Sequence, residues 1–354
     1  MLDVRRLRLL HDLDRLGTIA AVAGLHRYTP SAVSQQLSAL EREAGVPLLE
    51  RTGRRVTLTA AGRVLVRHAG AVLAALESAG AALAAARTGP SGPLRIGAFP
   101  TAVRTILPPA LVALGREHPA LDLMVTELDP AAVPAALRDR TLDAGLIHAY
   151  DPAPIPRSGP ALTVPAPLGP ASPSPPSPDL ASPDLASPAQ ASPDLASPAP
   201  ADREPVDRQS VGPASDDLES VALFDEAVHL AVPAAAGPAA TVADLRDRDW
   251  ITATPGTLCH GVTMRVCGDA GFTPRVRHQA DDFTAVLALV AAGQGVSLVP
   301  ALATTAPPPG VRLLPVPTRR RTRLAYRRGA AGHPAVAALT AALHAAIRTV
   351  VAAP

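Results

Sequence analysis

The sequence predicts an α/β protein with an N-terminal winged helix-turn-helix, a long linker helix and a two-lobed α/β domain. Residues 1–58 hold helical patterns joined by a short turn and followed by an arginine-rich hairpin. Residues 59–88 form one proline-free stretch with apolar side chains at helical spacing. Over residues 94–150 and 221–354, short Val, Ile and Leu runs alternate with helical patterns, as they do in βαβ units.

Composition limits the class of protein. The 354 residues are enough for two or three domains, and 47% of them are hydrophobic, which is ample for folded cores. Two cysteines do not make a disulfide framework, and no run of 18 apolar residues is free of charge or proline. The first residues mix acidic and apolar side chains and lack the cleavage site of a secretory signal. We therefore expect a cytoplasmic protein without a membrane segment.

The net charge of +2 is unevenly distributed along the chain. All 33 basic residues are arginine, and residues 1–67 carry a net charge of about +5. A basic segment of this kind suits contacts with DNA phosphates and the release of their counterions. The alternative is an ordinary solvated surface, so the motifs within the segment have to distinguish between DNA binding and a surface without a partner.

A proline-rich segment interrupts the predicted α/β domain. Roughly half of the chain's 40 prolines fall within residues 151–220, where the five-residue unit SPDLA occurs three times. Frequent prolines remove amide donors and block helices, and little apolar surface is present to offset the entropy of ordering. We expect residues 152–215 to form a disordered insertion. A tolerated surface loop is the simpler interpretation, and a partner-binding tract is the alternative.

The helix-turn-helix is predicted from capping signals and apolar spacing. Thr29 is placed to cap a helix whose first residue is Pro30. Val33, Leu37 and Leu40 follow at helical spacing and are expected to face inward. The opposite face carries short hydroxyls and amides, which a helix needs in order to lie against base edges in the major groove. The residues expected to contact DNA from this helix are Thr29, Pro30, Ser31, Ser34, Gln35 and Ser38.

A two-stranded wing is expected to follow over residues 46–59. Its predicted tip is arginine-rich, and guanidinium groups at such a tip would meet phosphates or the minor groove. The wing residues expected to contact DNA are Arg51, Arg54 and Arg55. A solvated hairpin without a DNA role is the alternative.

These residues resemble the DNA-binding head of LysR-type transcriptional regulators. The run from the recognition helix through the wing carries that family's pattern at Leu40–Glu41, Gly45–Leu48, Arg51, Leu58–Thr59 and Ala61–Gly62. Leu49 stands where the family usually has Phe, and His26–Arg27 disturb the usual Leu at the end of the preceding helix. The resemblance implies double-stranded promoter DNA as a partner, with RNA polymerase as a further candidate.

A long linker helix is expected after the wing. Thr59 can cap it, and apolar residues then step by alternating fours and threes, the spacing of a coiled coil. A single amphipathic helix packed on its own domain is the alternative. The resemblance implies a homodimer, with tetramers common in the family, and a hinge is expected at residues 89–93. The residues expected at the dimer interface are Leu65, Val72, Leu76 and Leu83.

Residues 94–350 are predicted to form an effector-binding domain. Strand patterns occur at residues 94–99, 121–128, 142–148 and 221–233. Their order resembles the two-lobed co-inducer domain of LysR-type regulators, which is similar in fold to periplasmic solute-binding proteins. The resemblance places lobe I over residues 94–150 and 301–350, and lobe II over residues 221–300.

Two strand-to-helix turns are candidate ligand sites. In each, backbone amides and a threonine hydroxyl are expected at strand ends, where α/β sheets hold anions. A small carboxylate is therefore the effector hypothesis, and plain N-capping by both threonines is the alternative. The resemblance implies that both turns line the cleft. The residues expected to bind the effector are Pro100, Thr101, Thr254, Gly256, Thr257 and, more loosely, Asp282.

Other chemistries fit less well. Cys259 and Cys267 lie on one predicted helix, about 12 Å apart along its axis, which is too far for a disulfide without local unfolding. Peroxide sensing is therefore disfavoured, as is a metal site built from these cysteines and His260. We expect no cofactor and no metal. No GxSxG, Walker or HExxH motif is present, so an enzyme is not expected. A solute-binding receptor without a DNA role is the alternative function.

Overall fold

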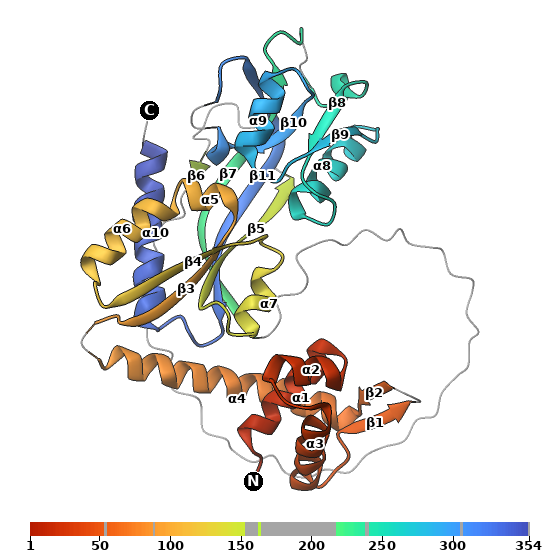
Figure 1. The fold of residues 1–354 in the computed structure, drawn as a ribbon, viewed down its shortest axis with the longest axis vertical. Coiled ribbons are helices and arrows are strands. Elements are labelled where there is room, and N and C mark those ends of the chain that lie inside the picture. The colour runs from red at the N-terminus through yellow and green to blue at the C-terminus, as the bar shows by residue number, and fades with distance from the viewer. Residues whose placement is uncertain are drawn as a thin grey trace, which may run out of the picture. The chain divides into compact units, whose positions relative to one another are not determined.

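A computed structural model describes residues 1–52, 55–87, 89–152, 162–163, 217–237, 241–304 and 307–352. They form a helical head with a small hairpin, a long helix and an α/β domain (Figure 1). The predicted fold class is thus confirmed. Most of the proline-rich insertion lies outside the described residues.

The head contains the expected helices and hairpin. Thr29 caps the third helix through the N–H of Ala32, and Pro30 is its first residue. The side chain of Asp3 caps the first helix in the same way, and Gly17 ends it with a positive φ of 73°. The elements of the head are α1 (Val4–Leu16), α2 (Ile19–His26), α3 (Pro30–Ala44), β1 (Leu49–Thr52) and β2 (Arg55–Leu58).

The inward face of α3 was predicted correctly. Val33, Leu37 and Leu40 are fully buried among leucines of α1. The Glu41 carboxylate accepts the backbone N–H groups of Leu48 and Leu49, at 2.9 and 3.0 Å. This contact fixes the start of the wing to the recognition helix, because a charged acceptor shared by two amides is a strong hydrogen-bonding arrangement.

The linker helix α4 (Ala60–Ala85) begins at the Thr59 cap. Its first turns pack on the head, where Leu65 is half-buried and Ala69 is fully buried. By length and apolar composition alone, α4 is the one helix of the described residues that could cross a membrane. A single helix of this kind is weak support for a membrane span, and α4 carries Arg67 and Glu77 within its length.

The α/β domain is organised around one curled sheet with the strand order β10-β7-β11-β5-β3-β4. The strand β3 is parallel to β4 and β5, whereas β11 pairs antiparallel with both β5 and β7. The strands of this sheet are β3 (Gly92–Ala98), β4 (Leu121–Glu127), β5 (Ala144–Pro152), β6 (Leu162–Thr163), β7 (Leu218–Pro233), β10 (Ser297–Pro300) and β11 (Val311–Arg327).

Helices and a second small sheet complete this domain. The helices α6 and α10 lie side by side near β3 and β4 (Figure 1). The remaining elements are α5 (Pro100–Arg104), α6 (Leu107–Glu117), α7 (Val133–Arg138), β8 (Asp249–Thr252), α8 (Leu258–Asp269), β9 (Arg275–Gln279), α9 (Phe283–Ala291), α10 (Pro334–Ala352) and short 3₁₀ turns at Ala243–Leu245 and Ala301–Ala303.

The packing divides the lobes differently from the predicted boundaries. Leu223 and Phe224 on β7 belong to the core around β3 and α6, whereas Leu230 on the same strand belongs to the core around Trp250. On β11, Val316 packs in the second core and Leu324 in the first. Both strands therefore run through both lobes, so lobe limits at residues 221 and 301 are corrected. A continuous pair of strands is a stiffer connection than a loop.

Three local expectations also need correction. A single helix from Pro100 through Leu107, Leu111 and Leu114 is expected from the apolar spacing, but it breaks at Thr105–Ile106, because the prolines at the start of α6 have no N–H to continue the ladder. Residues 162–163 were expected to be disordered but form β6, which pairs with Glu226 and Asp225. The expected hinge is shorter than predicted, because β3 already begins at Gly92.

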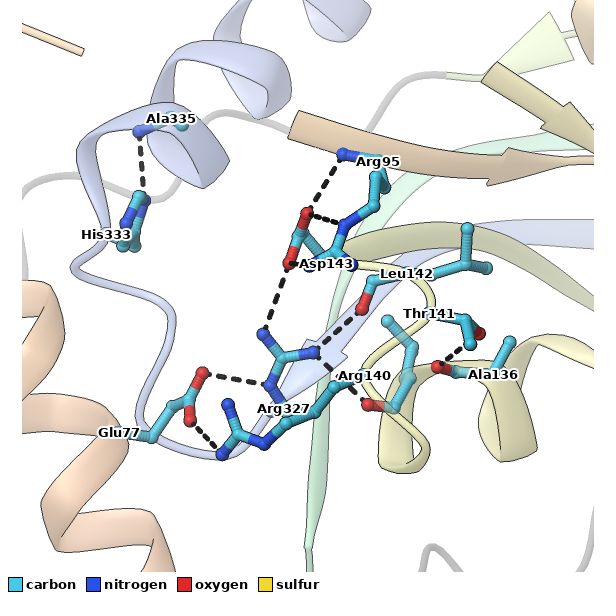
Figure 2. A network of polar contacts seen from close by, with 11 residues as sticks. Glu77, Arg95, Ala136, Arg140, Thr141, Leu142, Asp143, Arg327, His333 and Ala335 are labelled. Carbon is cyan, nitrogen blue, oxygen red and sulfur yellow. Dashed lines mark hydrogen bonds and ion pairs between the residues drawn. The ribbon is translucent and has the colours of Figure 1, made fainter. Parts of the chain in front are cut away.

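An ion-pair network joins α4 to the α/β domain (Figure 2). Glu77 on α4 accepts from Arg327 at 2.9 Å and from Arg140 at 2.8 Å. Arg327 also lies 3.5 Å from Asp143, which makes two further bonds to the Arg95 guanidinium. Burial raises the pKa of Glu77, but Arg327 and Arg140 outweigh it and the net pKa lies below its usual range.

This depressed pKa predicts an acid-dependent stability. Glu77→Gln is expected to lower the melting temperature at pH 7 by about 2–6 °C, because two guanidinium groups lose their carboxylate. An acid with a lowered folded-state pKa stabilises the fold above its unfolded pKa of about 4.3, and this contribution is lost as the pH falls further. The difference between wild type and variant should therefore shrink below about pH 4.3, as thermal unfolding at several pH values would reveal.

The exposed Glu117→Gln on α6 is the matched control, since it removes the same charge from a site outside the network. It should differ little from wild type at any pH. A Glu77→Gln penalty that stayed constant from neutral pH down to about pH 3.5 would contradict the assignment.

Candidate DNA-binding and effector sites

The recognition face of α3 is mostly available to a ligand. Ser31, Gln35 and Ser38 are exposed, as are Thr29 and Pro30 at the start of the helix. The Thr29 hydroxyl already has two partners within the chain, because it accepts the Ala32 N–H and contacts the Ser31 hydroxyl at 3.0 Å. The exposed face thus offers an amide and short hydroxyls to a groove.

Ser34 differs from the expectation that it is exposed. Its side chain is half-buried, and its hydroxyl donates to the Pro30 carbonyl at 3.0 Å. A serine within a helix often bonds back to the carbonyl four residues earlier, which leaves its hydroxyl proton unavailable. Ser34 is therefore a weaker candidate for base contact than Gln35.

The wing forms as predicted, but its arginines are not described. Leu49 pairs with Leu58 and Thr52 with Arg55 in antiparallel register. Arg54 lies outside the described residues, as do the side chains of Arg51 and Arg55. Their roles stay predictions.

A cavity of about 230 Å³ lies between the lobes of the α/β domain. One side comes from the end of β3 and the start of α5, with Phe99, Pro100 and Thr101. The other side comes from lobe II, where Thr257 and Cys259 at the N-terminus of α8 contribute. Clefts between domains lined by apolar groups and a few polar ones are the usual sites of small ligands.

Arg320, which lines this cavity, is paired with Glu226, which is not among the lining residues. The Arg320 side chain is 1% exposed and the Glu226 side chain is not exposed at all. Arg320 Nε donates to Glu226 Oε1 at 2.7 Å, and Nη2 lies 2.6 Å from the same oxygen without hydrogen-bond geometry. The guanidinium also lies over the Phe99 ring, 4.8 Å from its centre. Burial opposes the charge on Arg320, but Glu226 outweighs it and raises the Arg320 pKa.

His148 and Tyr150 extend from the same region of β5. The His148 ring packs edge-on against Phe99 and Tyr150, and no partner of its Nδ1 atom is found among the described residues. Burial lowers the pKa of His148 well below its usual range, and Arg320 lowers it further, so the ring is neutral at physiological pH. The Tyr150 hydroxyl lies 3.3 Å from Cys259 Sγ. The cavity thus carries a guanidinium and a neutral imidazole.

Three carboxylates, Glu127, Asp129 and Asp281, lie around the same cavity. Asp281 accepts both the backbone N–H and the hydroxyl of Thr254, at 2.8 and 2.7 Å. The prediction that Thr254 offers free donors to an anion is therefore wrong, because a carboxylate of this chain already holds them. The cavity combines a buried cation with acidic groups.

The predicted effector residues fall into two groups. Pro100, Thr101 and Thr257 line the cavity, whereas Thr254, Gly256 and Asp282 are not among its lining residues. Thr101 is buried in the first turn of α5 and is not its cap, since Phe99 holds that position without a side-chain bond. Thr257 does cap α8, through the N–H of His260. Asp282 caps α9 and pairs with Arg104 of α5, an ion pair across the two lobes.

Arg320, Glu226 and His148 were not among the residues predicted to form the effector site. A signal for Arg320 was present, because Thr318, Arg320, Thr322 and Leu324 alternate on β11 and all four are buried. That period of two would have placed one arginine of a basic run on the inner face. No local signal pairs it with Glu226, which lies 94 residues away in the chain.

The two cysteines lie on one continuous helix, as expected. Cys259 lies near the start of α8, and Cys267 is buried near its end in the core around Trp250. Burial raises the pKa of Cys259 and raises that of Cys267 to about 12. Both are therefore thiols at neutral pH. Among the described residues, no group of three His, Cys, Asp or Glu side chains is placed to hold a metal ion.

Comparison with known proteins gives two family matches. The profile of the bacterial regulatory helix-turn-helix protein, lysR family, matches residues 4–63. The profile of the LysR substrate binding domain matches residues 87–163 and 208–348, more than half of the chain. Residues 164–207, which the second profile does not match, contain most of the proline-rich insertion.

Individual relatives agree with this assignment. A probable hydrogen peroxide-inducible genes activator of Mycobacterium xenopi is 42% identical over 136 residues, 38% of this chain and 70% of that protein. For its namesake in Mycobacterium avium, 41% identical, the match spans only 38% of the relative's length. The transcriptional dual regulator GltC of Bacillus subtilis is 23% identical over 84% of this chain and 81% of its own.

Solved structures show the same fold. A full-length cysteine-to-aspartate variant of OxyR from Pseudomonas aeruginosa superposes with a TM-score of 0.53 at 20% identity, covering 97% of this chain and 95% of that one. A hydrogen peroxide-bound cysteine-to-serine mutant of Corynebacterium glutamicum OxyR gives 0.51 at 22% identity, covering 99% and 94%. The chain belongs to the LysR family of bacterial transcriptional regulators, which bind DNA through the helix-turn-helix and respond to effectors through the α/β domain.

Proposed function

We propose that this regulator contacts promoter DNA chiefly through Gln35, Ser31 and Ser38 of α3, with arginines of the wing on the phosphates. The observation that carries the proposal is the exposed polar face of a helix whose other face is fully buried. Gln35 is the strongest candidate for base recognition, because an amide can make two hydrogen bonds to adenine in the major groove. A solute receptor without a DNA role would not require a helix-turn-helix head with an exposed polar helix face.

Gln35→Ala is expected to weaken binding to the promoter of the target gene by about ten- to a hundred-fold, while binding to random duplex changes little. Gln36→Ala is the matched control, because Gln36 is the same residue one position on and its carbonyl accepts from Arg6 Nε at 2.9 Å. Fluorescence anisotropy at several salt concentrations measures both. Equal losses for the two variants, or none for Gln35→Ala, would sink the proposal.

We propose that two chains dimerise through the later turns of α4. Val72, Leu76 and Leu83 are 39%, 47% and 73% exposed, which is unusual for large apolar side chains along one helix face. Leu65, predicted for the same seam, instead packs on the core of its own head. The seam proposed here therefore begins about two turns later than expected.

The double variant Leu76→Glu, Leu83→Glu should convert dimers to monomers, because two carboxylates per chain would be buried unpaired in the seam. Sedimentation analysis at micromolar concentration measures the change. Ala85→Glu, an exposed position on the other side of α4, is the control and should remain dimeric. A dimer that survived the leucine substitutions would show that the seam lies elsewhere.

We infer that the effector is a small molecule with an anionic group and a cationic or hydrogen-donating group, bound between the lobes. A carboxylate facing Arg320 and His148 would meet two donors, while an amine at the other end would meet Asp129 or Asp281. A plain dianion fits worse, because three carboxylates surround the cavity. Amino acids are one such class.

A thermal-shift comparison tests this class directly, with amino acids set against the matching carboxylic acids that lack the amine. Stabilisation by the simple acids alone would refute the inference. Peroxide is the second candidate, favoured by the names of the relatives and by the placement of Cys259 in the cavity. The raised pKa of this thiol argues against it, since the thiolate is the reactive form. The proposal places the protein in the cytoplasm, without enzymatic activity.

A further inference from the structure

A second cavity, of about 190 Å³, lies where α1, α4 and the α/β domain meet. It is distinct from the effector cavity, with which it shares no lining residue. Arg8 and His11 of α1 line one side, and Arg140 and Arg327 of the α/β domain line the other. Arginines from both parts of the chain therefore line one partly open cavity.

The acidic side chains around this cavity already have partners. Glu77 is shared by Arg140 and Arg327, as Figure 2 shows. The other three are held in pairs of their own: Asp217 with Arg138 at 2.8 Å, Asp139 with Arg15 at 2.9 Å, and Asp12 with His26 at 2.8 Å. None of these pairs includes Arg8.

Arg8 lines this cavity but takes part in none of these ion pairs. It is half-buried, and no ion pair or hydrogen bond of its guanidinium is found among the described residues. Burial lowers the pKa of Arg8, and Arg140 lowers it further, although Asp12 and Glu77 oppose this from a distance. Within the part of the chain that the structure describes, this guanidinium thus lacks a direct counterion.

The backbone at Arg140 is a second observation. Its φ of 58° lies in the left-handed region, which residues other than glycine adopt at a cost. Glycine would make this turn without strain, so an arginine here is explained by its side chain and not by the turn. That side chain bonds to Glu77 and lines the cavity opposite Arg8.

We propose that this cavity binds a tetrahedral oxyanion, inorganic phosphate or the phosphoryl group of a small metabolite, between Arg8 and Arg140. Guanidinium groups recognise phosphate oxygens by paired hydrogen bonds, and a cavity of this volume has room for one such group. The anion would supply the missing charge and bridge the DNA-binding head to the α/β domain. The site is independent of the proposed effector cavity.

The test compares thermal unfolding of the full chain in sodium phosphate and in sodium chloride of equal ionic strength. The wild-type melting temperature is expected to rise by about 2–4 °C in phosphate, and calorimetric titration should give one site per chain. Arg8→Gln should lose this rise while remaining at least as stable as wild type in chloride, because it relieves repulsion among guanidinium groups.

Arg140→Gly is the second variant, since it relaxes the backbone while removing the opposite side of the site. It too should lose the phosphate response. Arg116→Gln, on the exposed surface of α6, removes the same charge elsewhere and should keep it. Equal phosphate shifts in wild type, Arg8→Gln and Arg140→Gly, or no shift in wild type, would overturn the proposal.

A nucleoside monophosphate in a parallel arm separates the two sources of the oxyanion. Tighter binding of the nucleotide than of inorganic phosphate, lost in Arg8→Gln, would indicate a phosphorylated metabolite. Binding of inorganic phosphate alone would indicate the free ion. Either result supports the site.

Discussion

Glu226→Gln is expected to destabilise the α/β domain by about 3–5 kcal/mol, because it leaves the guanidinium of Arg320 buried without its counterion. Glutamine keeps the shape of the side chain and can still accept the Leu302 N–H, now held by Glu226 Oε2 at 2.6 Å. The loss reports the charge together with the hydrogen bond that Glu226 Oε1 accepts from Arg320 Nε, because the glutamine NH2 group would then face that donor. Urea unfolding followed through Trp250, the only tryptophan of the chain and fully buried, measures it.

Two further variants sharpen this test. Glu219→Gln removes a half-exposed carboxylate from the same strand, 3.9 Å from Arg328, and should cost at most about 1 kcal/mol. Glu226→Gln combined with Arg320→Met should recover most of the lost stability, because replacing both members of a buried pair removes the uncompensated charge. Recovery of stability with loss of the effector response would show that the pair is kept for binding. A Glu226→Gln protein as stable as wild type would refute the account.

Gly62→Ala should unfold the wing side of the head, with a cost of about 1–3 kcal/mol or more. A Cβ at this position would lie 2.2 Å from the Leu48 carbonyl oxygen and 3.2 Å from Leu58 Cδ2. The carbonyl cannot easily move, because it accepts the Thr59 N–H at 2.9 Å where α4 begins. The added methyl group must therefore push α4 away from the wing.

Gly80→Ala is the matched control, on the same helix with nothing within 4 Å of the added methyl group. It should stabilise α4 by up to about 1 kcal/mol, since alanine favours helix over glycine. Opposite shifts in melting temperature for the two variants are the expected result. Gly62→Ala should also weaken promoter binding although no DNA-contacting side chain changes. If both variants melted alike, the close contact would be irrelevant.

The head was largely predictable because its signals are local. Thr29 and Pro30 mark the start of α3 within two residues, and apolar spacing alone identified Val33, Leu37 and Leu40 as its buried face. The family resemblance rested on the same short run. Leu65, which spacing assigned to the dimer interface, packs in part against the core of its own head, and its place in that interface stays a prediction.

The proposed effector cavity was predictable only in outline, because its chemistry depends on contacts distant in sequence. Spacing identified strand ends at Thr101 and Thr257, and both line the cavity. Asp281, however, accepts hydrogen bonds from Thr254, which lies 27 residues away in the sequence. Glu226 pairs with Arg320, which lies 94 residues away.

Periodicity and capping predicted the helices of the head and their inward faces, and the resemblance of one short run of residues pointed to the family, since each of these signals is carried by a short stretch of chain. The burial of one particular arginine with one particular glutamate was not available from any such stretch. It follows from the pairing of β7 with β11, because the register between distant strands brings together side chains that no local pattern connects.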